Sequence, residues 1–365
     1  MHKLTTPRST AFPSHESTAK LESLNALRGL AALLVALDHT ILLGSRPTPD
    51  SGLFQVATFM GAFGVGAFFL LSGFVIFISL ERTPPARFLL QRVFRLYPVI
   101  ITAVALRLVS QLALDMRACD AETLGIFLLN ISLFGNLFMG IEKNIEPIVW
   151  TLNIEVKFYL LMALVFTVAG RRPQARMFPL LTLMACLLGW CASRFPRWIV
   201  KYAPPVETTA DLQLAVSCLP VLFLGTVACL AYRRTLTPSR IWTLAGLFLV
   251  VLFFAPEAGI TTRKNLAAWT VALVLFLACV YSPVLRSRLD KAWLRWLGAI
   301  SYPLYAVHST VIEFLVHAMP SMPTAAVMAG SMVLTLATAH AMHRWIEDPI
   351  HQWSRRRFAA PGRRS

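Results

Sequence analysis

The segment LNALRGLAALLVALDHT, residues 24–40, is an apolar run that carries an arginine near one end and an Asp-His pair near the other. Arg28 and His39 are eleven residues apart, which on an α-helix is close to three turns and a rise of about 16 Å, so both side chains project from one face. That geometry suits one elongated polar ligand lying along the helix. The alternative is that each side chain snorkels to its own headgroup layer.

A pair of arginines follows the second apolar run, in ERTPPARFLLQRVFRLYP. Arg92 and Arg95 are three residues apart, so on a helix that enters the membrane at Pro98 they share a face and could clamp a phosphate. The alternative is a basic loop that only sets the topology.

The stretch WTLNIEVKFYLLMAL, residues 150–164, places Glu155 about one turn inside the expected outer interface. A carboxylate at that depth needs a partner, and a histidine on another helix is the natural one. The alternative is a charge exposed at the membrane rim.

A polar stripe occurs late in the chain, in SYPLYAVHSTVIEF. Tyr302, Tyr305 and His308 stand at positions i, i+3 and i+6 of an otherwise apolar helix, so they share one face. Polar tyrosines that only pack between helices are the alternative. The chain closes with HRWIEDPIHQWSRRR, in which Glu347, Asp348 and Pro349 are expected to end the last helix before a basic tail.

The amino-acid composition indicates whether these side chains lie in a membrane or in water. The chain has 365 residues, of which 56% are hydrophobic and 14% charged, with a mean hydropathy of +0.63. Soluble domains carry about 25% charged residues, so this is a membrane protein. Its net charge of +16 could suggest nucleic acid, but the basic residues form short clusters between apolar runs. That pattern is the cytoplasmic excess of Lys and Arg that orients membrane helices, and no nucleic-acid partner is expected.

The expected fold is all-α, a polytopic bundle of about ten transmembrane helices. The glycines of GAFGVGAFFLLSGFVI, residues 61–76, would allow helices to approach closely. The apolar runs are residues 24–43, 57–80, 96–114, 149–169, 177–194, 212–231, 241–255, 265–284, 296–317 and 323–345.

The apolar piece at residues 122–139 is shorter and is interrupted by polar residues, so we expect a re-entrant or interfacial segment. With both termini cytoplasmic, almost all basic loops then face inward. We expect residues 1–20 to be a disordered cytoplasmic tail, 21–347 the membrane domain and 348–365 a basic cytoplasmic tail. The cysteines show no CxxC spacing and are expected to be inert, and no metal site is expected.

Taken together, these motifs resemble the integral-membrane acyltransferase-3 family, which includes bacterial polysaccharide O-acetyltransferases. The resemblance rests on the Arg28 to His39 spacing and on GVGAFFLLSGF, RVFRLYP, WTLNIEVKFYL, ISYPLYAVH and RWIEDP, which occur in this order over nearly the whole chain. It implies O-acyl transfer from an acyl-CoA, commonly acetyl-CoA, to a hydroxyl of a cell-surface carbohydrate or lipid-linked acceptor. It also implies the bacterial inner membrane as the location.

The family's functional positions fall on residues already singled out. Its arginine and histidine fall on Arg28 and His39, and its glutamate on Glu155; its arginine pair and late polar stripe fall on Arg92, Arg95, Tyr302, Tyr305 and His308. Two departures stand out. Ser217 and Cys218 occupy a place where relatives often have an arginine, and no SGNH-type esterase domain follows residue 347.

Acyl transfer to an alcohol needs a base near the operating pH, and imidazole is the usual one. We expect His39 to be that base, with Glu155 or Asp38 as its acidic partner. Arg28 is expected to be a further catalytic residue, about three turns away on the same helix face. Tyr302, Tyr305 or His308 could stabilise the negative charge on the thioester carbonyl. The arginines would hold the CoA phosphates on the cytoplasmic side.

Some alternatives stay open at this point. His39 could form a covalent acyl intermediate instead of acting as a base, and the acceptor, the acyl length and the oligomeric state are not specified by the sequence. The competing class is a transporter or flippase of a carbohydrate or lipid-linked substrate, in which ionisable groups line a path without covalent chemistry. Inverted repeats would favour that class, and none is seen.

Overall fold

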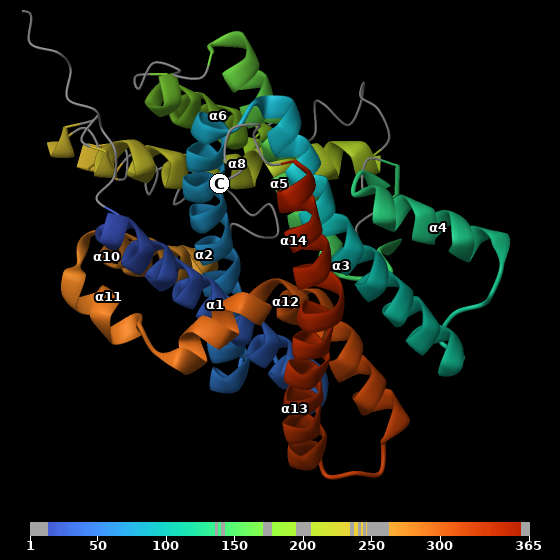
Figure 1. Cartoon of the computed structure of the whole chain (residues 1–365). Coiled ribbons are helices and arrows are strands. Elements are labelled where there is room, and N and C mark those ends of the chain that lie inside the picture. Colours follow the sequence, from blue (N-terminus) through green and yellow to red (C-terminus); the bar gives the residue numbers. More distant parts are fainter. Residues whose placement is uncertain are drawn as a thin grey trace, which may run out of the picture.

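The computed structural model describes residues 14–135, 138–139, 143–170, 177–194, 206–233, 237–239, 242–243, 246 and 263–358. Its regular elements over these residues are all helical, which confirms the all-α fold (Figure 1). The helices are α1 (Ser14–Ser45), α2 (Gly52–Arg82), α3 (Pro85–Ala113), α4 (Ala121–Ser132), α5 (Val149–Val168), α6 (Met177–Arg194), α8 (Val206–Tyr232), α10 (Arg263–Tyr281), α11 (Pro283–Leu289), α12 (Ala292–Ala318), α13 (Thr324–Met342), η3 (His343–Glu347) and α14 (Asp348–Arg357).

Several of these helices can cross a bilayer. Among the described residues, 7 are long and apolar enough, or up to 8 if the bent pair of α10 and α11 forms one span. The 7 are α1, α2, α3, α5, α8, α12 and the continuous helix from α13 through α14. The polytopic bundle is therefore confirmed, although this count is lower than the expected ten. Two expected spans account for most of the difference: α6 is helical but not among the 7, and residues 241–255 lie almost entirely outside the described residues.

Helix α4 corresponds to the interrupted apolar piece at residues 122–139. It has 12 residues, so it is about 18 Å long, well short of the roughly 30 Å hydrocarbon core. Asp120 caps its first turn by accepting a hydrogen bond from the Thr123 amide (2.8 Å), and Leu133 ends it in the left-handed conformation. A short apolar helix that packs beside α3 fits the expected non-crossing segment (Figure 1).

Small residues set how closely the central helices approach. A Cβ atom on Gly29 of α1 would lie 2.6 Å from the Gly298 backbone nitrogen of α12, and one on Gly298 would lie 2.6 Å from the Asn25 carbonyl oxygen. A Cβ on Gly73 of α2 would similarly lie 1.8 Å from the Leu222 carbonyl oxygen of α8. Backbones this close leave no room for a larger residue, which confirms the close approach expected for the glycine-rich stretch of α2.

Replacing Gly73 with valine is expected to destabilise the bundle by about 1–3 kcal/mol or more, because the added atoms meet backbone that cannot rotate away. Thermal unfolding of the purified protein in detergent measures this change. The matched control is Gly125→Val in α4, where a Cβ would meet nothing within 4 Å. Equal unfolding temperatures for the two variants would contradict the close approach of α2 and α8.

The hydrophobic core is built from aromatic rings that connect four helices. Edge-to-face ring pairs join α2 to α10 through Phe74 and Phe276 (5.7 Å between centroids) and α2 to α5 through Phe77 and Phe166 (5.6 Å). Phe158 on α5 meets Phe223 on α8 at 5.2 Å. Offset and edge-to-face ring pairs are favourable beyond the area that they bury, so this core fixes α2 and α5, which carry part of the site described below.

The ends of the described chain differ from the sequence interpretation. The expectation that Glu347, Asp348 and Pro349 end the last helix is wrong: η3 inserts one π-helical turn, and α14 continues from Asp348 to Arg357. Pro349, which has no amide hydrogen to donate, directly follows the π-helical turn, where the Asp348 amide donates to the His343 carbonyl oxygen and the regular α-helical hydrogen bonding is interrupted. At the other end, α1 begins at Ser14, so residues 14–20 of the segment expected to be a disordered tail are helical.

Candidate active site

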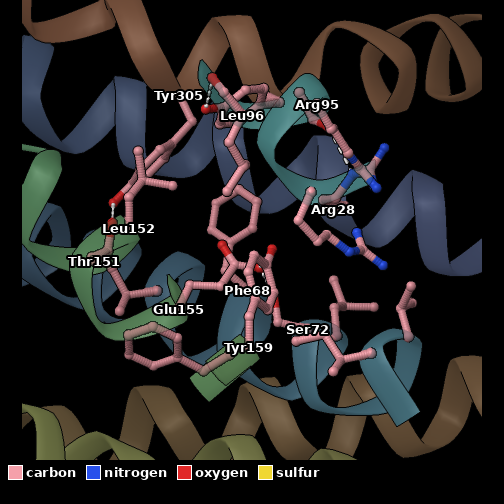
Figure 2. A pocket seen from close by; sticks show the side chains of 18 of the residues that line it. Arg28, Phe68, Ser72, Arg95, Leu96, Thr151, Leu152, Glu155, Tyr159 and Tyr305 are labelled. Carbon is pink, nitrogen blue, oxygen red and sulfur yellow. Dashed lines mark hydrogen bonds between the residues drawn. The ribbon is translucent and has the colours of Figure 1, made fainter. Parts of the chain in front are cut away.

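A pocket lies between α1, α2, α3, α5 and α12, with about 970 Å³ of empty space including its mouth. Six of the residues expected to act on substrates line it: Arg28, Arg92, Arg95, Glu155, Tyr302 and Tyr305. Figure 2 shows Arg28 and Arg95 at one side of this pocket and Tyr305 with Thr151 at the other.

Arg28 is fixed by the close crossing of α1 and α12. Its Nε donates to Ser301 Oγ (2.8 Å) and its Nη2 donates to the Gly298 carbonyl oxygen (3.0 Å). Both acceptors belong to the turn of α12 that packs on Gly29, so a bulkier residue at either glycine would move them away. Arg28 is thus held at the pocket wall rather than snorkelling freely to a headgroup.

The arginine pair of α3 also lies at the pocket. Arg92 Nη2 donates to Ser79 Oγ of α2 (3.0 Å), and its guanidinium lies over the rings of Phe88 (4.9 Å) and Tyr159 (5.4 Å). Cation–π contacts of this kind hold an arginine in place while leaving donors available. Together with Arg95 and Arg28, Arg92 gives the pocket three cationic side chains.

Glu155 is the acidic group of this pocket. Its Oε1 accepts hydrogen bonds from Ser72 Oγ of α2 (2.7 Å) and from the Tyr159 hydroxyl one turn further along α5 (2.6 Å). It therefore does not serve as the acidic partner of His39 in this structure. Sequence reasoning missed Ser72 and Tyr159, although the spacing of Glu155 and Tyr159 at i and i+4 indicated that these two could meet.

Replacing Glu155 with alanine is expected to destabilise the protein by about 1–3 kcal/mol, because the hydroxyls of Ser72 and Tyr159 lose their common acceptor. Glu155→Gln keeps an acceptor oxygen and is the matched control, so it should unfold closer to the unmodified protein. Thermal unfolding in detergent tests this order. Equal loss in both variants would show that the negative charge, not the hydrogen bonds, is what stabilises the pocket.

His39 and His308 form a pair at a second place, outside the lining of this pocket. Their ring centroids are 4.9 Å apart in an edge-to-face arrangement. His39 Nδ1 lies 3.0 Å from the Val35 carbonyl oxygen, and His308 Nδ1 lies 2.8 Å from the Tyr305 carbonyl oxygen. Each carbonyl can only accept, so both Nδ1 atoms are assigned as protonated and both Nε2 atoms carry the lone pair. Asp38 lies farther, 3.5 Å from His39 Nδ1.

Tyr305 joins the pocket to the histidine pair. It lines the pocket, its hydroxyl is 2.8 Å from Thr151 Oγ1, and its ring centroid is 5.7 Å from that of His308. Tyr302 also lines the pocket and donates to the Leu96 carbonyl oxygen (2.9 Å). The face shared by Arg28 and His39 therefore meets the arginine-lined pocket at one end and the histidine pair at the other, with Tyr305 between them.

A buried ionic cluster that sequence reasoning missed lies next to the histidine pair. Arg107 contacts Glu313 at 2.5 Å and Glu146 at 4.0 Å. Glu146 is fully buried and accepts hydrogen bonds from Ser309 and from Thr310 (2.5 Å), the residues that directly follow His308. Burial raises the pKa of Glu146 above its ordinary value, although Arg107 opposes that rise. Arg107 lies inside an apolar run, and a charged residue within a membrane helix is energetically unfavourable. That position could have identified it as a candidate functional residue.

Among the residues that the structure describes, no group of three or more His, Cys, Asp or Glu side chains is arranged to hold a metal ion. The pocket can bind a polyanion through its arginines, and the histidine pair can take and return a proton.

The bundle of apolar helices defines an integral membrane protein. It carries a pocket lined by three arginines and, beside that pocket, a pair of histidines. The acyltransferase domain family model matches residues 21–344. The chain is also 24% identical over 336 residues to Nodulation protein 10 of Rhizobium leguminosarum bv. viciae, covering 83% of this chain and 86% of that protein. No solved structure matches. The chain belongs to the acyltransferase-3 family and is a membrane acyltransferase.

Proposed function

We propose that this protein is an O-acyltransferase that moves an acyl group, acetyl in the simplest case, from acyl-CoA to a hydroxyl of a cell-surface carbohydrate or a related lipid-linked acceptor. The strongest support comes from Tyr305, which connects the arginine-lined pocket to the histidine pair. Tyr305 lines that pocket, and its ring packs on His308. A donor bound in the pocket would thus have its reactive end next to a base.

The pocket suits the donor by charge. CoA carries several phosphates, and Arg28, Arg92 and Arg95 outnumber the single carboxylate, Glu155, that lines the pocket. Asn25 lines the same pocket and is exposed, so the pocket opens near the beginning of the apolar part of α1. The basic turn between α2 and α3 is at this end of the bundle, and basic turns face the cytoplasm. Acyl-CoA would therefore enter from the cytoplasm, with both chain termini on that side of a bacterial inner membrane.

His39 is the proposed general base. Its side chain is 34% exposed, so an acceptor can reach it, and the Val35 carbonyl leaves its Nε2 free to take a proton. The acceptor hydroxyl gives its proton to Nε2 while its oxygen bonds to the thioester carbonyl carbon. The carbon–sulfur bond then breaks, and the CoA thiolate takes the proton back from His39. General base catalysis of this kind contributes roughly 10²- to 10⁴-fold.

The remaining site residues have supporting roles in this proposal. Arg28 is held rigidly by Ser301 and Gly298, so it can bind the donor near its reactive end without reorganising. Glu155 takes part by holding Ser72 and Tyr159 beneath the donor. In this proposal Tyr302, Tyr305 and His308 surround the place where negative charge would develop on the carbonyl oxygen. Either tyrosine hydroxyl would donate to that oxygen after turning from its present partner.

The test uses the purified protein reconstituted in vesicles with radiolabelled acetyl-CoA inside and envelope glycans of the encoding organism outside. Label that becomes covalently attached to glycan supports the proposal. Glycan or lipid-linked glycan that crosses the vesicle membrane unchanged, with no label attached, would contradict it and would favour the transporter class.

A further inference from the structure

The two ends of the proposed reaction path differ in charge. The pocket holds Arg28, Arg92 and Arg95 against Glu155, so its lining is net positive. Around the histidine pair the balance is reversed, because a single arginine, Arg107, stands among three carboxylates. Such fields act on any charged ligand that comes close, and they act strongly where water is excluded.

Three carboxylates lie around His39 and His308. Asp38 Oδ2 is 3.5 Å from His39 Nδ1. Glu146 accepts from Ser309 and Thr310, the two residues that follow His308, and Glu313 lies one turn further along α12 and contacts Arg107. We call Asp38, Arg107, Glu146 and Glu313 the outer acidic cluster.

Protonation does not make this cluster positive. Burial raises the pKa of Glu146, so this carboxyl takes up a proton more readily than an exposed glutamate as the pH falls. Arg107 and Glu313 then still form an ion pair with no net charge. The Asp38 carboxyl adds either a negative charge or no charge, never a positive one. The outer acidic cluster is therefore neutral or negative, and an anionic group brought against it is repelled or has to be buried without a cation to pair with.

The cluster also has hydrogen-bonding capacity that no protein group uses. Arg107 Nε and Nη1, which can only donate, are buried without a protein hydrogen-bond partner. Asp38 Oδ1 and His308 Nε2, which accept as assigned, are likewise buried without one. These three side chains are at most about one-tenth exposed. A mixture of unused donors and acceptors matches hydroxyl groups, which both donate and accept, because buried polar groups are normally satisfied.

We infer that the outer acidic cluster, together with His39 and His308, is the acceptor subsite, and that it takes an uncharged, hydroxyl-rich sugar unit and excludes units that carry a carboxylate or phosphate near the acylated hydroxyl. This inference rests on the proposed function and specifies its acceptor. The same protein thus uses an arginine pocket for a polyanionic donor and a neutral or negative site for the acceptor, which keeps the donor's phosphates away from the acceptor's place.

The first experiment identifies the acylated unit. The reconstituted protein is incubated with labelled acetyl-CoA and total envelope glycan, and mass spectrometry of glycan fragments locates the label. Label on uncharged sugar units is the expected result. Label on uronic acid or phosphorylated units would overturn the inference while leaving the proposed function intact. Label on no glycan would contradict the proposed function itself.

A second experiment removes one charge from the outer acidic cluster. The acylated sugar found in the first experiment is compared with its C6-carboxylate derivative by kcat/KM, in the unmodified protein and in Glu313→Gln. The variant should improve the relative kcat/KM of the carboxylate derivative by roughly 10-fold, because one repulsive charge is gone. Glu122→Gln, which removes an exposed charge on α4, is the matched control and should leave the ratio unchanged. An unchanged ratio in Glu313→Gln would overturn the charge argument.

Discussion

Replacing His39 with alanine should lower kcat for acyl transfer by roughly 10²- to 10⁴-fold, because the acceptor hydroxyl then has no base to take its proton. KM for the acyl donor should change little, since His39 is not among the residues that line the arginine pocket. Transfer of labelled acetyl groups to glycan, measured with the purified variant in vesicles, gives both values.

The control for His39→Ala is His340→Ala, which removes an exposed imidazole on α13 that contacts Trp296. That variant should retain the rate of the unmodified protein. A His39→Ala protein that elutes as a folded species and still transfers acetyl at the normal rate would refute the assignment of the base. Labelled acetyl found covalently attached to His39 itself during turnover would instead indicate a covalent intermediate, the alternative that the sequence leaves open.

Replacing Arg95 with alanine should raise KM for acetyl-CoA by roughly 10- to 100-fold, because a hydrogen bond to a charged group contributes about 1.5–3 kcal/mol. We expect kcat at saturating donor to be nearly unchanged, since Arg95 binds the phosphates in both the ground state and the transition state. The effect should shrink with S-acetylpantetheine as donor, because that molecule lacks the CoA phosphates.

The matched control for Arg95 is Arg87→Ala, in the same basic segment but not among the residues that line the pocket. If the segment only sets the topology, both variants should behave alike and change insertion rather than KM. A KM increase confined to Arg95→Ala, in protein that is normally inserted, separates a phosphate-binding role from a topological one.

In the arginine-lined pocket, sequence and structure agree on which residue types are present but not on which residues contact each other. The sequence placed a histidine beside Glu155, whereas the structure gives Glu155 to Ser72 and Tyr159. In the structure, the His39 ring instead packs edge-to-face on the imidazole of His308, and its Nδ1 lies beside the Val35 carbonyl oxygen. Partnerships between helices depend on their rotation and register, which apolar periodicity does not encode, because lipid and protein interior are equally apolar.

From the sequence it follows that this chain is a membrane protein and that its elements are helices. The sequence also identifies which ionisable residues inside apolar runs are candidates for function. These conclusions follow from composition and from local helical geometry: Arg28 and His39 share a face of α1 because of their spacing. The short length and polar interruptions of residues 122–139 also indicated a segment that does not cross the membrane, and α4 is a short helix.

The contacts of that face depend on how the helices pack. The contact of Gly29 with Gly298 fixes the register of α1 on α12, and this register brings Ser301 to Arg28 and His308 to His39. The packed bundle also brings together Arg107 of α3, Glu146 of the segment before α5, and Glu313 of α12. Backbone contact between small residues selects one register among several that are equally apolar, and that selection is a property of the packed bundle rather than of any single helix.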